Sequence, residues 1–120
     1  MTTPSVEVAS SYITRLEKDA KGSLTAILIL AIINQDKMTW GYKIKKKLAE
    51  ITNKNIEVSY STLYTILRNF EVKYSLVESE MEDKRRLYSI TTKGRQILSE
   101  MSEFWDNLLD VSRVAFKNLD

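Results

Sequence analysis

The sequence predicts a mainly α-helical fold with one small β-hairpin, and three observations support this class. Apolar residues recur at steps of three and four over most of the chain, which is the spacing of helices. Two short alternating segments flank a polar turn at residues 83 and 84, which indicates a hairpin. The 120 residues include only one Pro and three Gly, so long irregular loops are not expected. A chain of this length forms one ordinary domain.

Residues 5 to 34 predict two helices. In the first, over residues 5 to 20, the apolar positions that share one face are Val6, Ala9, Ile13, Leu16 and Ala20. Gly22 is a stop signal after it, and Ser23 can cap a second helix from Leu24 to Asn34. The second helix is apolar nearly all round, so we expect it in the centre of the fold. Its roughly ten residues are about half of what a membrane span needs.

The segment "WGYKIKKKLAEIT", residues 40 to 52, predicts a third helix with Thr39 as its cap. The side chains expected to face inward are Trp40, Ile44, Leu48 and Ile51. The side chains expected to face outward are Lys43, Lys46 and Lys47. The exposed side of this helix is therefore basic.

A fourth helix and a hairpin follow. The helix is expected over "SYSTLYTILRNFEVKY", residues 59 to 74, and its inner face holds Leu63, Ile66, Leu67 and Phe70. Its outer face holds Ser61, Thr65, Arg68 and Val72. The segments "SLVESEME", residues 75 to 82, and "RRLYSIT", residues 85 to 91, alternate as strands do. The turn between them, near Asp83 and Lys84, lacks the usual Gly or Asn.

The C-terminal segment from Thr92 to Leu119 is again helical in pattern. Its apolar residues keep the strict four-three alternation of a coiled-coil seam: Ile97, Met101, Phe104, Leu108, Val111 and Ala115. At the rise of an α-helix this segment is about 40 Å long. A small domain cannot cover that length, so we expect a second chain against the apolar face.

Charge and composition limit the function. The net charge is +2, but residues 39 to 95 hold twelve Lys and Arg against seven Asp and Glu, whereas residues 96 to 120 hold two against five. A basic middle suits a polyanion. The chain has no Cys and no His, which removes thiol nucleophiles, the commonest metal ligands and the usual general base near neutral pH. We therefore expect no enzyme, no cofactor and no metal site, and a cytoplasmic location because no signal peptide or membrane span is present.

Three compact helices followed by a hairpin describe a winged helix-turn-helix, in which the helix before the hairpin enters the major groove of DNA. Its candidate contacts are Ser59, Tyr60, Ser61, Thr62, Tyr64, Thr65, Arg68 and Asn69. Free amides near the helix start favour a phosphate, and Arg68 is the best candidate to reach a guanine. The candidates for phosphate contact are Lys84, Arg85 and Arg86 at the hairpin tip, and Lys43, Lys46 and Lys47 on the preceding helix.

A second function stays open at this point. Glu78, Glu80 and Glu82 lie on the strand that faces the basic hairpin tip and can neutralise it. The alternative is a winged-helix module that binds a protein partner without specific DNA binding. A steep dependence of affinity on salt would distinguish DNA from a protein partner.

Four segments resemble the PadR family of transcriptional regulators over residues 24 to 98. They are "LTAILILAII", "WGYKIKKKL", "YSTLYTILRNFE" and "RRLYSITTKGRQIL", in the order and spacing of the family. The matching positions are Gly41, Tyr42, Thr62, Leu63, Tyr64, Tyr88, Ile90, Thr91 and Gly94. The resemblance implies that Tyr42 packs inward. Each motif alone is weak, and the four in register make a more specific match.

The resemblance implies a homodimeric, usually repressing DNA-binding protein whose C-terminal helix makes the dimer. We therefore expect three parts: an N-terminal helix at residues 1–22, whose own apolar stripe can pack on the dimer, a DNA-binding domain at 23–91 and a dimerisation helix at 92–120. The expected interface residues are Ile97, Met101, Phe104, Trp105, Leu108, Val111 and Ala115. In some members aromatic residues border a site for a small aromatic effector, here Phe104 and Trp105. Two domains related by a twofold axis would bind a pseudo-palindromic sequence of double-stranded DNA.

Overall fold

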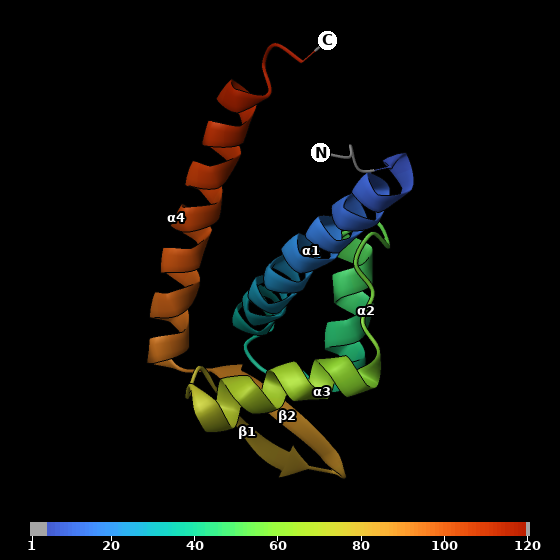
Figure 1. Cartoon of the computed structure of the whole chain (residues 1–120). Helices are drawn as coiled ribbons and strands as arrows, with labels where there is room; N and C mark the ends of the chain where they lie inside the picture. Colours follow the sequence, from blue (N-terminus) through green and yellow to red (C-terminus); the bar gives the residue numbers. More distant parts are fainter. Residues whose placement is uncertain (1–4, 120) are drawn as a thin grey trace.

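The computed structural model describes residues 5–119, and the outer ends of the predicted terminal segments, residues 1–4 and 120, lie outside the described residues. In chain order the elements are α1 (Val6–Asp36), α2 (Gly41–Ile51), α3 (Tyr60–Arg68), the π-helix η1 (Asn69–Lys73), β1 (Val77–Glu82), β2 (Arg85–Ile90) and α4 (Thr92–Ala115). Figure 1 shows α2, α3 and the hairpin gathered at one end, with α1 and α4 extending away from it. The predicted mainly α-helical fold with a winged helix-turn-helix is confirmed.

Helix α1 is one continuous helix, so the predicted break at Gly22 is wrong. The helix is capped by Ser5, whose hydroxyl oxygen accepts from the N–H of Val8 at 3.2 Å. A glycine inside a helix costs only about 1 kcal/mol relative to alanine, which is too little to interrupt a helix whose second half lies in the core. Ser23 is therefore an interior residue rather than a cap, and the division expected between residues 22 and 23 falls inside α1.

The second half of α1 forms the centre of the core, as its apolar character predicts. Ile29, Ile32 and Ile33 are almost completely buried there. The other buried hydrophobic residues of this cluster are Leu30, Ile44, Leu48, Ile56, Val58, Leu63, Leu67, Phe70, Leu76, Val77 and Tyr88. Ile51, which the sequence predicts inside, is 52% exposed because it is the last residue of α2 and extends past the core.

The residues before α2 form a short extended segment. The N–H of Thr39 donates to the carbonyl of Tyr88 at 3.1 Å, and the N–H of Tyr88 donates to the carbonyl of Thr39 at 2.7 Å. Trp40 then occupies the cap position of α2, without a side-chain hydrogen bond. The prediction that Thr39 caps α2 is therefore wrong, because its backbone pairs with β2 instead. This pairing fixes the hairpin to the start of α2.

The predicted hairpin is confirmed. Strands β1 and β2 pair antiparallel, from Val77 opposite Ile90 to Glu82 opposite Arg85. Asp83 and Lys84 form the turn, with φ of 49° and 65°. Positive φ at both central residues is what a type I′ turn requires, since this turn follows the twist of the strands. The strand pairing thus holds two side-chain-bearing residues in a region that glycine and asparagine usually occupy.

Helix α4 begins at a tight junction. The hydroxyl oxygen of Thr91 accepts from the N–H of Gly94 at 2.9 Å and donates to the carbonyl of Ser75 at 2.8 Å. A Cβ on Gly94 would overlap the carbonyl oxygen of Leu76, so a glycine is needed here. The helix ends at Ala115, before the predicted end at residue 119. Within residues 5–119 we find no helix that is both long and apolar enough to span a membrane.

Candidate nucleic-acid interface

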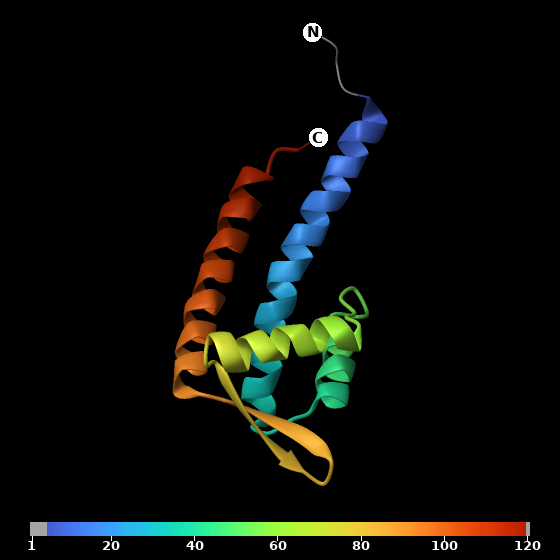
Figure 2. The same ribbon diagram turned by 60° about the horizontal axis from the view of Figure 1, so that its bottom comes forward.

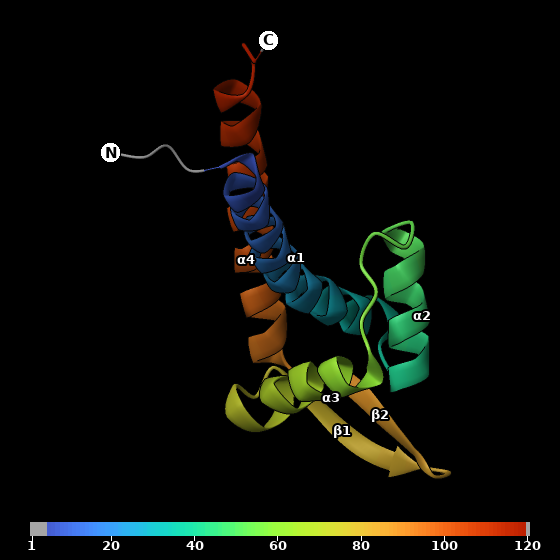
Figure 3. The same ribbon diagram turned by 45° about the vertical axis from the view of Figure 1, so that its right-hand side comes forward.

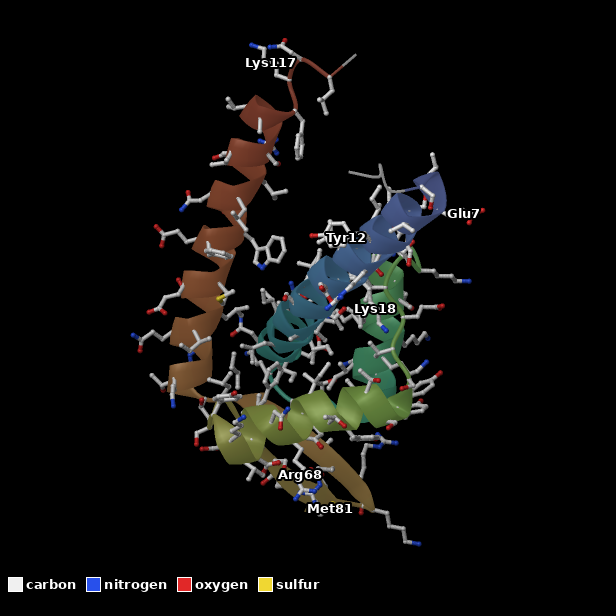
Figure 4. The ribbon with its side chains drawn as sticks, in the orientation of Figure 1. Glu7, Tyr12, Lys18, Arg68, Met81 and Lys117 are labelled. Carbon is white, nitrogen blue, oxygen red and sulfur yellow. The ribbon has the colours of Figure 1, made fainter. Side chains whose placement is uncertain are left out.

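The segment from Ser59 to Asn69 comprises α3 and one flanking residue at each end, and every residue that the sequence predicts for DNA contact on this segment is exposed. The exposed residues are Ser59, Tyr60, Ser61, Thr62, Tyr64, Thr65, Arg68 and Asn69. Leu63 and Leu67 are buried on the opposite side and hold the helix against the core. Ser59 caps the helix, since its hydroxyl oxygen accepts from the N–H of Thr62 at 3.1 Å. Figure 4 shows Arg68 at the end of α3, on the side of the hairpin in this view.

Two tyrosines form the beginning of this exposed face. The rings of Tyr60 and Tyr64 stack, with centroids 6.2 Å apart and planes at 21°. The ammonium group of Lys45, on α2, lies 5.3 Å from the centroid of the Tyr60 ring. A Cβ on Gly41 would overlap the hydroxyl group of Tyr64, so this glycine makes room for the ring. The Tyr64 hydroxyl therefore lies against the start of α2.

The hairpin tip lies over Trp40. The guanidinium carbon of Arg85 is 4.2 Å from the Trp40 ring centroid and the ammonium group of Lys43 is 5.4 Å from it, both cation–π contacts. The sequence predicts Trp40 in the core, but it is only half-buried. Tyr42 is 59% exposed, so its predicted inward packing is also wrong. Helical spacing assigns the Trp40 ring inward, yet Trp40 precedes the helix and has an extended backbone.

These side chains line one groove of about 420 Å³ between the starts of α2 and α3 and the hairpin tip. The lining residues are Trp40, Gly41, Tyr42, Tyr60, Tyr64, Lys84, Arg85 and Arg86. Three of these are cationic and four are aromatic. Such a groove suits a phosphate chain, because cations attract phosphates and tyrosine hydroxyls can donate hydrogen bonds to their oxygens.

Comparison with known protein families agrees with this geometry. The sequence profile of the transcriptional regulator PadR-like family matches residues 29–100, more than half of the chain. The chain belongs to this family. It is therefore a DNA-binding transcription regulator rather than an enzyme.

Individual relatives of this PadR-like regulator are distant in sequence. An uncharacterized protein of Lysinibacillus sphaericus is 27% identical over 105 residues, which cover 83% of this chain and 94% of the relative. The crystal structure of a PadR family transcriptional regulator from Eggerthella lenta has a TM-score of 0.71 at 22% identity, covering 89% of this chain and 90% of the other. That of a Streptococcus transcriptional regulator has a TM-score of 0.67 at 26% identity, covering 82% and 96%. These two structures share the fold of this chain.

The lysines of α2 in this PadR-like regulator differ in what they contact. Asp36, at the end of α1, has one carboxylate oxygen 2.5 Å from the Lys47 ammonium group and the other 3.9 Å from that of Lys43. Lys46 is exposed, and no ion pair involves it within residues 5–119. Two of the three lysines that the sequence predicts for DNA contact thus also fix α2 to α1, and their contact with DNA stays a prediction.

The glutamates of β1 lie on one face of the hairpin and Arg86 lies on the other. The pairing places Glu82 opposite Arg85, and Met81 opposite Arg86. Successive side chains of a strand point to opposite faces, so the acidic face carries Arg85 and the other face carries Met81 and Arg86. Met81 is labelled near the hairpin tip in Figure 4. The glutamates of β1 therefore share a face with Arg85 and not with Arg86.

The apolar seam of α4 has two parts. Ile97 and Met101 are half-buried and line an apolar cavity of about 170 Å³ together with side chains of α1 and the segment after α3. Farther along, Phe104, Leu108, Val111 and Ala115 are exposed. Trp105 is half-buried, and its ring meets that of Phe104 edge-on, with centroids 6.4 Å apart. The first part of the seam packs within the chain, and the second part is available to a partner.

Sequence reasoning missed Trp40, Tyr42 and Lys45 as surface residues of the site. The signal that could have found them is the mixture of aromatic and basic residues in "WGYKIKKK", which is typical of surfaces that bind nucleic acid.

Among residues 5–119 no group of three or more His, Cys, Asp or Glu could hold a metal ion.

Proposed function

We propose that the chain is a repressor that binds, as a homodimer, a pseudo-palindromic operator in double-stranded DNA. The observation that carries this proposal is the aromatic and basic groove beside the exposed face of α3. In this arrangement α3 enters the major groove and the hairpin tip follows the adjacent sugar-phosphate backbone. Groups that bind bases and groups that bind phosphates then share one continuous surface.

The site residues divide by role. Arg68 has a guanidinium that can donate to both O6 and N7 of one guanine, and Thr65 and Asn69 approach the neighbouring base edges. Lys84, Arg85 and Arg86 bind phosphates, as do the hydroxyls at the start of α3, because these groups line the groove or lie next to it. Phosphate contacts supply most of the affinity, and base contacts supply the specificity.

Exposed apolar residues support the homodimer. On α1 they are Val6, Val8, Tyr12, Ile13 and Leu16, and on α4 they are Phe104, Leu108, Leu109, Val111 and Val114. Soluble monomers rarely expose so much apolar surface. Figures 2 and 3 show both helices projecting from the winged helix on the side away from the hairpin tip. A second chain against these helices would bury the apolar residues and leave α3 and the hairpin open to DNA.

Repression would follow from occupation of the operator by the dimer. A dimer whose half-sites lie one helical turn apart covers two successive major grooves and excludes other proteins from the same DNA.

A small aromatic effector beside Phe104 and Trp105 would act on this dimer. Phe104 is exposed on the face of α4 that the second chain would cover, so we expect the effector site between the two chains.

A Leu108→Glu, Val111→Glu double variant is expected to be monomeric. Both side chains are exposed in the single chain and would become buried in the dimer, where unpaired carboxylates cost several kcal/mol. We expect the dissociation constant of the dimer, measured by sedimentation equilibrium, to rise about 100-fold or more. Ser102→Glu, an exposed position of α4 off the seam, is the control and should stay dimeric. A double variant that also stays dimeric would contradict the assigned interface.

Lys46→Ala should weaken DNA binding, whereas Lys47→Ala should mainly lower thermal stability. Lys46 has an exposed side chain, but Lys47 neutralises the nearly buried carboxylate of Asp36. With two chains per duplex, Lys46→Ala should make the slope of log K against log salt shallower by about 2. Titrations at several salt concentrations and thermal melts of both variants measure these effects. The reverse pattern would assign the phosphate contact to Lys47.

The proposal as a whole is tested by titrating the protein into labelled duplexes at several salt concentrations and determining the number of chains bound. If a dimer neutralises about six to eight phosphates, log K should fall with log salt at a slope of roughly −5 to −7. A nearly flat dependence would favour the alternative, a module that binds a protein partner. Transcription from a promoter that carries the operator should fall when the protein is added, and a rise would contradict repression.

A further inference from the structure

A chain of hydrogen bonds links the segment after the recognition helix to the hairpin. The hydroxyl of Ser79 donates to Oε2 of Glu71 at 2.7 Å, and Nη1 of Arg86 donates to Oγ of Ser79 at 2.9 Å. Glu71 belongs to η1, Ser79 to β1 and Arg86 to β2. One hydroxyl group therefore connects a cation of the hairpin tip to a carboxylate beside α3.

The strand register explains why Ser79 and Arg86 meet. Ser79 lies opposite Tyr88, and Met81 lies opposite Arg86, so Ser79 and Arg86 are diagonal neighbours on the same face. A long side chain such as arginine can span this diagonal. Glu80 points to the other face of β1 because side chains alternate along a strand, so it cannot take the place of Ser79.

The π-helix η1 places Glu71 beside this face. The N–H of Tyr74 donates to the carbonyl of Asn69 at 3.1 Å, which is the i to i−5 bond of a π-helix, an uncommon element that is frequent at functional sites. Glu71 is half-buried in this turn. Burial raises the pKa of the Tyr88 phenol, which Arg86 lowers and Glu71 raises further. The charges of Glu71 and Arg86 thus act on the same buried ring.

We propose that Glu71 and Ser79 are positioning residues that hold the Arg86 guanidinium in the direction in which it binds DNA. This inference rests on the proposed function. The bond to Ser79 uses part of one end of the guanidinium, and the fork-like arrangement of its N–H groups leaves other donors for a phosphate. Arg86 lines the aromatic and basic groove, so those donors are next to it. A side chain that is fixed before binding loses less conformational entropy when the complex forms.

Arg85 has a separate support. Its guanidinium lies on the Trp40 ring, on the face of the hairpin opposite to Arg86. The two neighbouring arginines are therefore directed by different partners, one by an aromatic ring and one by a carboxylate through a hydroxyl. Changes at Ser79 should consequently affect the contribution of Arg86 and not that of Arg85.

A double-mutant cycle on the preferred duplex tests this inference. Ser79→Ala should weaken binding roughly three- to tenfold in the wild-type background and keep the salt slope, because the charge of Arg86 remains. In the Arg86→Ala background the same change should alter affinity by less than about 1.5-fold, since nothing is left to position. Ser79→Thr keeps the hydroxyl and should restore affinity. Ser89→Ala, on the other face of the hairpin and opposite Glu78, is the matched control.

Substitution of Glu71 distinguishes a positioning role of its carboxylate from a purely electrostatic effect on DNA binding. Removing an acidic group near DNA should tighten binding if only charge matters. We expect Glu71→Ala to weaken binding roughly threefold because Arg86 loses its support, whereas Glu78→Ala, on the opposite face, should tighten binding or leave it unchanged.

Two results would overturn the positioning role. One is an equal effect of Ser79→Ala in both backgrounds, and the other is tighter binding by Glu71→Ala. Thermal melts of each variant separate a loss of folding from a loss of affinity. If the wild type binds no duplex, the proposed function fails and this inference with it. If the wild type binds and Arg86→Ala weakens binding without coupling to Ser79, the positioning role alone fails.

Discussion

An Arg85→Ala, Arg86→Ala double variant is expected to bind every duplex about 100-fold more weakly than the wild type at physiological salt. Each dimer would lose four cations of the groove, two from each chain, so the slope of log K against log salt should become shallower by roughly 3 to 4. Because phosphates carry no sequence information, matched and scrambled duplexes should lose affinity equally. Anisotropy titrations at three salt concentrations measure both quantities.

The control for this variant removes the same number of charges elsewhere. Lys18→Ala, Lys117→Ala changes two lysines that Figure 4 shows far from the hairpin tip. This control should keep both the affinity and the slope. If the arginine variant binds like the wild type, or if both variants lose affinity equally, the basic run at the hairpin tip is a solvated turn and does not bind phosphates.

A Gly94→Ala variant is expected to lose about 3 kcal/mol of unfolding free energy and roughly 10 °C of melting temperature. The added Cβ would overlap the carbonyl oxygen of Leu76 and lie 2.7 Å from a side-chain carbon of Ile90. The Leu76 carbonyl also accepts from the N–H of Thr91 at 3.0 Å, so it cannot move away without loosening the start of α4. Thermal unfolding followed by circular dichroism measures the change.

Gly22→Ala is the matched glycine substitution. Its Cβ would meet no heavy atom within 4 Å, and the position is inside α1, where alanine is favoured by about 1 kcal/mol. This variant should melt slightly higher than the wild type. An unchanged melting temperature for Gly94→Ala would show that the start of α4 can shift freely, contrary to the close approach described above.

Periodicity within an element predicts most of this fold. The spacing of Leu63 and Leu67 places the polar side of α3 outward, and the alternation around Asp83 and Lys84 identifies the hairpin although its turn lacks glycine. These features depend on neighbours along the chain, because side chains on one face of a helix or strand recur at a fixed period. The exposed face of α3 could therefore be predicted residue by residue.

Features that depend on distant partners could not be predicted in this way. Thr39 looks like a helix cap in the sequence, but Tyr88 supplies its hydrogen bonds, and this pairing places Trp40 beneath the hairpin tip. Gly22 looks like a stop, yet the core holds α1 in one piece. The contact of Asp36 with Lys47 likewise joins residues whose spacing gives no local signal.

Selection of bound sequences from a random pool of duplexes tests most directly whether this protein recognises DNA as a dimer. We expect enrichment of one pseudo-palindrome whose half-sites lie about 10 base pairs apart, with two chains bound to each duplex. A pool that remains random after repeated selection, at a salt concentration where the protein still binds, would contradict sequence-specific recognition by α3.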